Sequence, residues 1–226
     1  MVRFPANGTT GGGYLATPDS GSGPGVIVIQ EWWGLVDHIK DLADRFAGAG
    51  FVALAPDFYD GQTTTSPDEA GKLMMALEID DAEKHLRGAV DYLLARPEAS
   101  GARVGTVGFC MGGQLSLYAA CANAKVGACV DFYGIHPNVT PDLPSLQAPV
   151  LGFFAENDGM VTPQVARGLE RELKAAGKQV EITIFEGADH AFFNDTRSEV
   201  YHESYADQCW KRMTTFFERH LRDDVA

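Results

Sequence analysis

Six short apolar segments, separated by amphipathic stretches, constrain the fold of this chain more than any other feature. Within most of these segments consecutive residues are apolar, so both faces of an extended strand would be apolar. Such strands are typical of a parallel sheet covered by helices on both sides, because neither face then meets water. The expected strands are residues 26–29, 51–55, 104–109, 128–132, 150–154 and 180–185.

The stretches between the strands have the apolar spacing of helices. In residues 39–46 the apolar side chains recur at helical spacing, and Gly48 then marks the end of the helix. Thr162, which is followed by a proline, predicts the start of another helix, and Gly177 predicts its end. Strands that alternate with helices predict an α/β fold with a doubly wound, mostly parallel sheet and helices on both faces.

The sequence contains no repeat, linker or low-complexity stretch that would divide it. Residues 1–226 are therefore expected to form a single domain, since α/β folds reach this size on one core. Thr196 followed by Glu199 resembles a capping box and predicts the start of the last helix. The stretch 62–96 is longer than one crossover helix requires, and we expect part of it to fold over the carboxyl edge of the sheet as a partial lid.

The charge balance is strongly acidic. The chain has 18 lysines and arginines against 31 aspartates and glutamates, which gives a net charge of −13, and no basic cluster interrupts this acidity. Nucleic acids and anionic membranes are therefore not expected as partners. No apolar run approaches the ~18 residues of a membrane-spanning helix, and the first residues lack the apolar core of a signal peptide. We expect a cytoplasmic protein that is a monomer or a homodimer.

Four cysteines are spread along the chain, at positions 110, 121, 129 and 209. They form no C-x-x-C pair and have no histidine partners at zinc-finger spacing, which predicts reduced thiols. Neither a metal nor an organic cofactor is expected. Cys129 lies within an apolar strand and is interpreted as a core residue, whereas the surroundings of Cys110 indicate a reactive thiol.

Cys110 is the central residue of Gly108-Phe109-Cys110-Met111-Gly112, between a predicted strand and a predicted helix. So abrupt a turn strains the central residue and leaves no room for side chains at the two positions that glycine occupies. The central side chain then projects from the sheet edge beside a helix N-terminus. The helix dipole lowers the pKa of a thiol there, and the first helical N–H groups can bind an oxyanion. The motif therefore predicts a nucleophilic cysteine.

An acid and a histidine follow this motif in the order typical of elbow-type hydrolases. Asp158 follows the fifth apolar strand and His190 follows the sixth, so both lie on loops at the carboxyl edge of the sheet. His190 is expected to take the proton of the Cys110 thiol, and Asp158 to orient the imidazole and stabilise its charged form. Asp189 and Asp195 are alternative acids, but residues so close to His190 in sequence rarely point at its ring.

The other histidines are weaker candidates for the site. His136 lies in a loop after a strand and remains a weaker candidate for a site residue. Those in helical segments are expected at the surface, namely His38, His85, His202 and His220. Glu31 is a more unusual candidate, because it follows the strand at 26–29, whose end borders the nucleophile loop in this topology. Two tryptophans follow Glu31, so its carboxylate is not expected to be fully solvated.

Together these motifs resemble the dienelactone hydrolase family of the α/β-hydrolase fold. The resemblance extends over about residues 12–221. It rests on the cysteine elbow, the Q-E-x-x-G loop at 30–34, the A-P-D-x-Y segment at 55–59, the D-x-x-V loop at 158–161 and the late histidine.

The resemblance implies a role for each site residue. Cys110 would be the nucleophile, His190 the base and Asp158 the acid. Glu31 would hold the resting thiol until substrate displaces the carboxylate. The backbone N–H groups of Trp32 and Met111 would form the oxyanion hole.

The chain departs from the family pattern where substrate would bind. Family members that act on dienelactone bind its carboxylate with arginines, one of them four residues past the histidine, where this chain has Asn194. Residues 63–75, where a second arginine is expected, contain none. We therefore expect a pocket suited to uncharged acyl groups. The candidate substrate-binding residues are Trp33, Phe58, Tyr59, Phe192 and Asn194.

The sequence thus predicts a hydrolase that cleaves small esters or lactones through a thioacyl-enzyme intermediate. An alternative on the same triad is a promiscuous carboxylesterase that also attacks activated phosphoesters. An alternative of another class is a non-catalytic ligand-binding or thiol-sensing protein. The two classes differ in one respect: a sensor needs a reactive thiol but has no need of His190.

Overall fold

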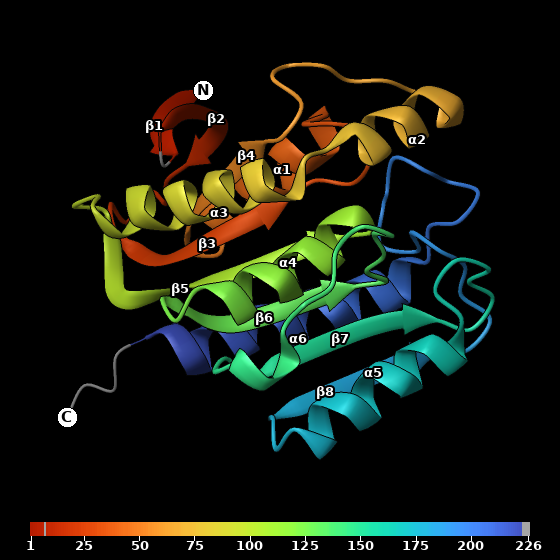
Figure 1. Cartoon of the computed structure of the whole chain (residues 1–226). Helices are drawn as coiled ribbons and strands as arrows, with labels where there is room; N and C mark the ends of the chain where they lie inside the picture. Colours follow the sequence, from red (N-terminus) through yellow and green to blue (C-terminus); the bar gives the residue numbers. More distant parts are fainter. Residues whose placement is uncertain (7, 223–226) are drawn as a thin grey trace.

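The computed structural model describes residues 1–6 and 8–222, which build one eight-stranded sheet with helices on both faces (Figure 1). The strand order is β1-β2-β4-β3-β5-β6-β7-β8. Neighbours from β4 to β8 along this order are parallel, whereas β1 and β2 pair antiparallel. The strands are β1 Val2–Ala6, β2 Thr9–Ala16, β3 Gly23–Ile29, β4 Val52–Asp57, β5 Ala99–Phe109, β6 Val126–Phe132, β7 Val150–Ala155 and β8 Val180–Phe185. The predicted doubly wound, mostly parallel sheet is confirmed.

Helices cover both faces of this sheet, as Figure 1 shows. On one face lie α1 (Asp37–Gly48) and α6 (Glu203–Leu221), and on the other α3 (Ile79–Leu94), α4 (Met111–Ala122) and α5 (Pro163–Ala175). A short α2 (Pro67–Ala76) and the 3₁₀ turn η1 (Leu143–Ser145) complete the described elements. No helix in the described part of the chain is both long and apolar enough to cross a membrane.

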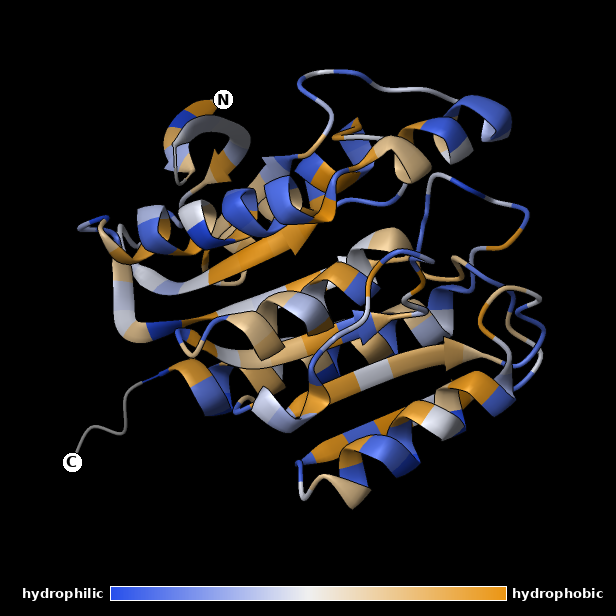
Figure 2. Cartoon of the chain, viewed as in Figure 1, coloured by the Kyte–Doolittle hydropathy of each residue, from blue (hydrophilic) through white to orange (hydrophobic). Residues whose placement is uncertain are grey.

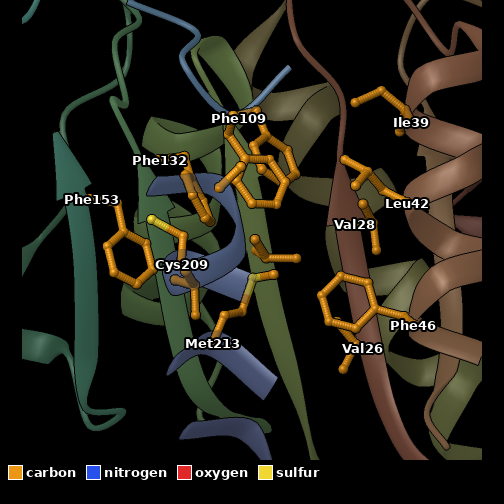
Figure 3. Packing of buried hydrophobic residues seen from close by; sticks show 14 of the residues in the cluster. Val26, Val28, Ile39, Leu42, Phe46, Phe109, Phe132, Phe153, Cys209 and Met213 are labelled. Carbon is orange, nitrogen blue, oxygen red and sulfur yellow. The ribbon is translucent and has the colours of Figure 1, made fainter. Parts of the chain in front are cut away.

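Two apolar layers, one on each face of the sheet, form the core. Figure 2 shows apolar strands at the centre and polar outer faces on the helices. In the layer of Figure 3, side chains of α1 pack on β3, and those of α6 pack against β5, β6 and β7. β3, β4, β6 and β7 are buried along their whole length, which is why their sequences are apolar on both faces.

The helix ends agree with the local sequence signals at α1 and α5 but not at α6. α1 ends at Gly48, and the Thr162 hydroxyl accepts a hydrogen bond from the Val165 N–H at the start of α5. The prediction that Thr196 begins the last helix is wrong, because α6 begins at Glu203. The N–H and hydroxyl of Thr196 both donate to Asn194 Oδ1, so this residue belongs to a turn.

The stretch 62–96 contains two helices with different positions. α3 is the crossover helix and packs on the sheet. α2 lies near the carboxyl ends of the strands: Gly71 lies beside the Trp32 ring, and the Met74 carbonyl is 3.2 Å from His136 Nε2. α2 therefore covers part of the carboxyl edge, as expected for a partial lid.

Candidate active site

Cys110 joins β5 to α4 in a strained turn. Its backbone has φ 54° and ψ −118°, a conformation that residues with side chains rarely adopt. A Cβ on Gly108 would collide with the Gly112 carbonyl, and one on Gly112 would collide with the Ile29 carbonyl. The elbow therefore requires both glycines, which is the steric reason for the motif found in the sequence.

Neighbouring backbone holds this strained turn in place. The Cys110 N–H donates to the Phe132 carbonyl at 3.0 Å, and the Cys110 carbonyl accepts from Gly113 at 2.9 Å and Ile135 at 3.1 Å. These bonds connect the elbow to the end of β6. The strain persists because the surroundings over-determine the conformation.

Asp158 and His190 meet on the loops that follow β7 and β8. His190 Nδ1 lies 2.6 Å from Asp158 Oδ2, while Asp158 Oδ1 accepts hydrogen bonds from the N–H groups of Met160 and Val161, both at 2.8 Å. This network fixes the carboxylate and orients the imidazole. His190 Nε2 is buried and has no hydrogen-bond partner among the described residues. It is the nitrogen left free to exchange a proton.

The alternative acids lie elsewhere. Asp189 is exposed, and Asp195 Oδ1 lies 3.2 Å from His38 Nδ1. His136 is also occupied, since its Nδ1 accepts from the Asn138 N–H and its Nε2 contacts the Met74 carbonyl. Of the acids considered from the sequence, Asp158 is the one hydrogen-bonded to His190.

The Cys110 side chain is only 5% exposed, and several groups act on its pKa. Burial raises the pKa of the thiol most, and the Glu31 charge raises it further, while a backbone hydrogen bond from Met111 opposes both. The resting thiol is therefore protonated at neutral pH. A protonated thiol in this position needs a base before it can act as a nucleophile.

Glu31 is buried beside the elbow, with 1% of its surface exposed. Burial raises the pKa of this carboxyl group, and the charges of His38, His190 and Arg197 oppose the rise. Asn194 Nδ2 donates to Glu31 Oε2 at 2.8 Å, and this hydrogen bond also favours the ionised form. Trp32 follows Glu31 in the loop that presses against the elbow at Gly112.

The five expected substrate-binding residues do not share one surface. Trp33 and Asn194 line a cavity of about 440 Å³ together with Arg197, whereas Phe58 and Tyr59 line a separate cavity of about 410 Å³. The Tyr59 hydroxyl lies 3.2 Å from Met111 Sδ. The amide of Asn194 binds Glu31.

Phe192 lies in the core and not on a cavity wall. Its side chain is fully buried, with its ring 5.1 Å from that of Phe185 and 5.6 Å from that of Tyr133. The expected contact between Phe192 and substrate is therefore not supported by its position, because no face of the ring is accessible.

The sequence analysis missed two buried residues near the site. Tyr133 has φ 41°, and its ring centroid lies 4.8 Å from that of His190. His38 was expected at the surface, which is wrong: it is 5% exposed, in the first turn of α1. A usable signal was its place four residues after the Q-E-x-x-G loop, on the side of the helix that carries Leu42.

The fold and this geometry agree with the similarity to known proteins. The model of the dienelactone hydrolase family matches residues 12–221. A putative carboxymethylenebutenolidase of Aquifex aeolicus is 35% identical, with 98% of this chain and 99% of the relative covered.

Two solved structures have the same arrangement over nearly their whole length. A putative dienelactone hydrolase from Klebsiella pneumoniae has a TM-score of 0.87 at 29% identity, covering 97% of this chain and 98% of the other. The dienelactone hydrolase-like promiscuous phosphotriesterase P91, from metagenomic libraries, has a TM-score of 0.86 at 25% identity, covering 97% of both chains. This chain therefore belongs to the dienelactone hydrolase family, a hydrolase family with the α/β-hydrolase fold.

Proposed function

We propose that this protein hydrolyses small uncharged esters or lactones, with Cys110 as nucleophile, His190 as general base and Asp158 as the acid that orients it. One observation carries the proposal: a strained cysteine elbow at a helix N-terminus shares one sheet edge with an Asp158–His190 pair whose Nε2 is free. A structural cysteine has no need of either feature.

The proposed reaction uses these groups in two halves, acylation and deacylation. His190 Nε2 takes the thiol proton as the sulfur attacks the carbonyl carbon, and the N–H groups of Met111 and Trp32 stabilise the oxyanion. The C–O bond then breaks, and the leaving alkoxide takes the proton from His190. A water that gives its proton to His190 attacks the thioester, and the proton returns to the Cys110 sulfur as it leaves. Asp158 stabilises the imidazolium in both halves of the cycle.

Glu31 has a separate role in this proposal. Its charge opposes the formation of a thiolate, so it restrains the resting nucleophile. Substrate that enters beside the elbow would displace the carboxylate and remove this opposition. The thiolate would then form where an electrophile is present, which limits oxidation of the cysteine between turnovers.

Among the described residues, the arginine that lines the cavity beside Asn194 is already paired with a carboxylate, which supports uncharged substrates. The Asn194 amide binds Glu31, and the Arg197 guanidinium is paired with Glu199 at 2.8 Å. A substrate carboxylate would have to break this pair or lose its hydration without compensation.

Ester hydrolysis by purified protein tests the proposal. We expect wild type to turn over p-nitrophenyl acetate and a simple lactone, and His190→Gln to lose turnover and slow iodoacetamide labelling of Cys110. His220→Gln, a substitution on the last helix, is the matched control and should retain both. A thiol that labels equally fast without His190, in a protein without turnover, would instead indicate a sensor.

The similarity to P91 favours activated phosphotriesters as a second substrate class. The same sulfur would attack phosphorus and expel p-nitrophenolate, and water would then release the phosphoryl group from the sulfur. Turnover of a p-nitrophenyl phosphotriester that disappears with Cys110→Ala supports this second activity. Turnover that survives the substitution would mean that the activity is not that of this site.

A further inference from the structure

His136 connects α2 to the loop after β6, and no step of the proposed reaction uses it. The residue is buried, with 3% of its surface exposed, and burial lowers the pKa of its ring, so the ring is neutral at pH 7. Nδ1 accepts a hydrogen bond from the Asn138 N–H at 3.1 Å, which leaves the ring proton on Nε2. Nε2 lies 3.2 Å from the Met74 carbonyl and donates to it, across 62 residues of sequence.

α2 has few other interactions that would hold its carboxyl-terminal half. Of its ten residues, all of them described, only Ala70 is buried, and helices of this length are marginal without packing. The last carbonyls of a helix lack partners within it, and the last turn of α2 carries no basic side chain. The Met74 carbonyl, in this last turn, accepts from the Leu77 N–H at 3.3 Å. His136 supplies a second donor to the same carbonyl.

The amino-terminal half of α2 contacts the candidate site. Just before the helix, the Thr64 N–H donates to the Trp33 carbonyl at 3.1 Å. Within the helix, a Cβ at Gly71 would lie 4.0 Å from the Trp32 ring. Trp32 carries one of the N–H groups proposed for the oxyanion hole. α2 is therefore held between the loop of these tryptophans and the ring of His136.

α2 borders both cavities described above. Pro67, at the start of the helix, lines the cavity of about 440 Å³ that Asn194 also lines. Leu73 and Ala76, near the end of the helix, line the cavity of about 410 Å³ beside Tyr59. One helix thus forms part of the wall of each cavity, and its position limits the room for a ligand there.

We infer that His136 is a positioning residue for α2: its hydrogen bond to the Met74 carbonyl holds the helix at the sheet edge, where the helix limits the size of the substrate. The inference rests on the proposed function and narrows its substrates to esters with short acyl groups. Both ring nitrogens bind main-chain groups, of Met74 and Asn138, so His136 acts through α2 and not on the reacting atoms.

Two substitutions separate the bond to Met74 from the other contacts of the ring. A glutamine amide places its nitrogen near the position of Nε2, so His136→Gln retains a donor for the Met74 carbonyl. An asparagine is one methylene shorter. His136→Asn therefore keeps an acceptor for the Asn138 N–H but does not reach Met74. His220→Gln, on α6, is the matched control.

Amide hydrogen exchange, measured by mass spectrometry, reports on α2 directly. We expect peptides that cover residues 67–76 to exchange about five- to tenfold faster in His136→Asn than in wild type, because a hydrogen bond that holds the helix is lost. In His136→Gln the rate should stay within about twofold of wild type. α5 is the internal control and should not change. Unchanged exchange in His136→Asn, or an equal increase in both variants, would overturn the inference.

p-Nitrophenyl esters of increasing acyl length test the limit on substrate size. In His136→Asn we expect the ratio of kcat/KM for the octanoate to that for the acetate to rise about fivefold, mainly through a lower KM for the octanoate. The kcat for the acetate should stay within about threefold of wild type. His136→Gln should retain the wild-type ratio. An unchanged ratio in His136→Asn would also overturn the inference, because α2 would then not limit the substrate.

Gly71→Ala should stabilise α2 and so act in the opposite direction. A Cβ there has ordinary contact with the Trp32 ring, and alanine favours a helix over glycine. We expect slower exchange in α2 and a lower octanoate-to-acetate ratio, each by about threefold. Slower exchange with an unchanged ratio would contradict the limit on size. If His136→Asn does not fold, the substitution is made in the Gly71→Ala background and compared with Gly71→Ala.

Hydrolysis of p-nitrophenyl acetate by the wild-type protein separates this inference from the proposed function. If wild type has no turnover, the proposed function fails whatever the exchange of α2 shows. If wild type turns over the ester and His136→Asn changes neither the exchange nor the ratio, only the inference fails.

Discussion

Cys110 and Cys129 lie in neighbouring regions of the molecule and are both almost completely buried. For both thiols, burial is the largest cause of a raised pKa. Cys129 lies within β6, where its sulfur is 3.4 Å from the Ser116 hydroxyl. Cys110 has a positive φ and lies at the end of β5 against the Met111 N–H. Burial therefore does not distinguish a structural thiol from a candidate nucleophile.

The difference lies in position along the strands. A residue within a parallel strand is surrounded by its own ladder and by the helices that cover the sheet. A residue just past the end of a strand meets the loops of the neighbouring strands, which here bring Glu31, Asp158 and His190 to one edge. Charged groups from three separate loops therefore act on Cys110, whereas the carboxylate that acts on Cys129 is Asp131 of its own strand.

Replacing each of the two cysteines with alanine should give the largest difference between the two positions. We expect Cys110→Ala to lower kcat for ester hydrolysis by about 10³-fold or more with little change in Tm, because alanine fits the elbow. Cys129→Ala should keep kcat within about twofold and lose about 1–2 kcal/mol of stability, because it leaves a small cavity. Paired measurements of kcat and Tm check both. Near wild-type turnover in Cys110→Ala would contradict the covalent mechanism.

The glycines on either side of Cys110 allow a test of the backbone at the elbow, separate from the test of the sulfur. Gly108→Ala should destabilise the fold by about 4 kcal/mol or more, because its Cβ would collide with the Gly112 carbonyl. Gly159→Ala is the matched control: a Cβ there meets nothing within 4 Å, and we expect a change within about 0.5 kcal/mol. Urea unfolding of both variants measures the difference. Equal stability of the two would mean that the elbow is not sterically constrained.

Asp131 connects the two regions, since it lies two residues after Cys129 and its Oδ1 packs closely against Gly113 in the first turn after Cys110. Burial raises the pKa of Asp131 to about 7, and a backbone hydrogen bond from Gly134 opposes the rise. A carboxyl with a raised folded-state pKa adds stability at low pH, and this contribution is lost as pH rises from about 4 through about 7.

Asp131→Asn should therefore remove this pH dependence of the free energy of unfolding. Relative to wild type, the variant should gain about 2–4 kcal/mol of unfolding free energy between about pH 4 and about pH 8. Urea titrations at several pH values measure this trend. Parallel stability curves for the two proteins would show that Asp131 does not titrate in the folded state.

The charge of the substrate should have the smallest of these effects, and the effect is on kcat/KM. We expect kcat/KM to be about 5- to 10-fold higher for neutral short esters than for carboxylate-bearing analogues, about 1 kcal/mol. Arg197→Gln should leave this preference unchanged or increase it, because Arg197 is already paired with Glu199. A preference for anionic esters that disappears in Arg197→Gln would instead assign the guanidinium to the substrate.

Local sequence patterns were sufficient to predict structure wherever a physical constraint acts within one short segment. Strands β3 to β8 follow from apolar runs that must avoid water on both faces, although β8, at the sheet edge, is only partly buried. The elbow follows from the collision that any Cβ at Gly108 would cause. Loops after β5, β7 and β8 meet at one edge of a parallel sheet, which is enough to predict that Asp158 and His190 lie together.

Contacts between distant segments were decided by the tertiary structure alone. The glycine-rich β2 is a strand because β1 and β4 hold it on both sides, and its own residues have little preference for this conformation. Glu31 and Asn194 are 163 residues apart, and His38 meets Asp195 across a similar separation. The sequence by itself determined the sheet and the elbow, because hydrophobic burial and backbone sterics act within a segment. Which charge faces which buried carboxylate depends on how the loops pack, and no local pattern specifies that.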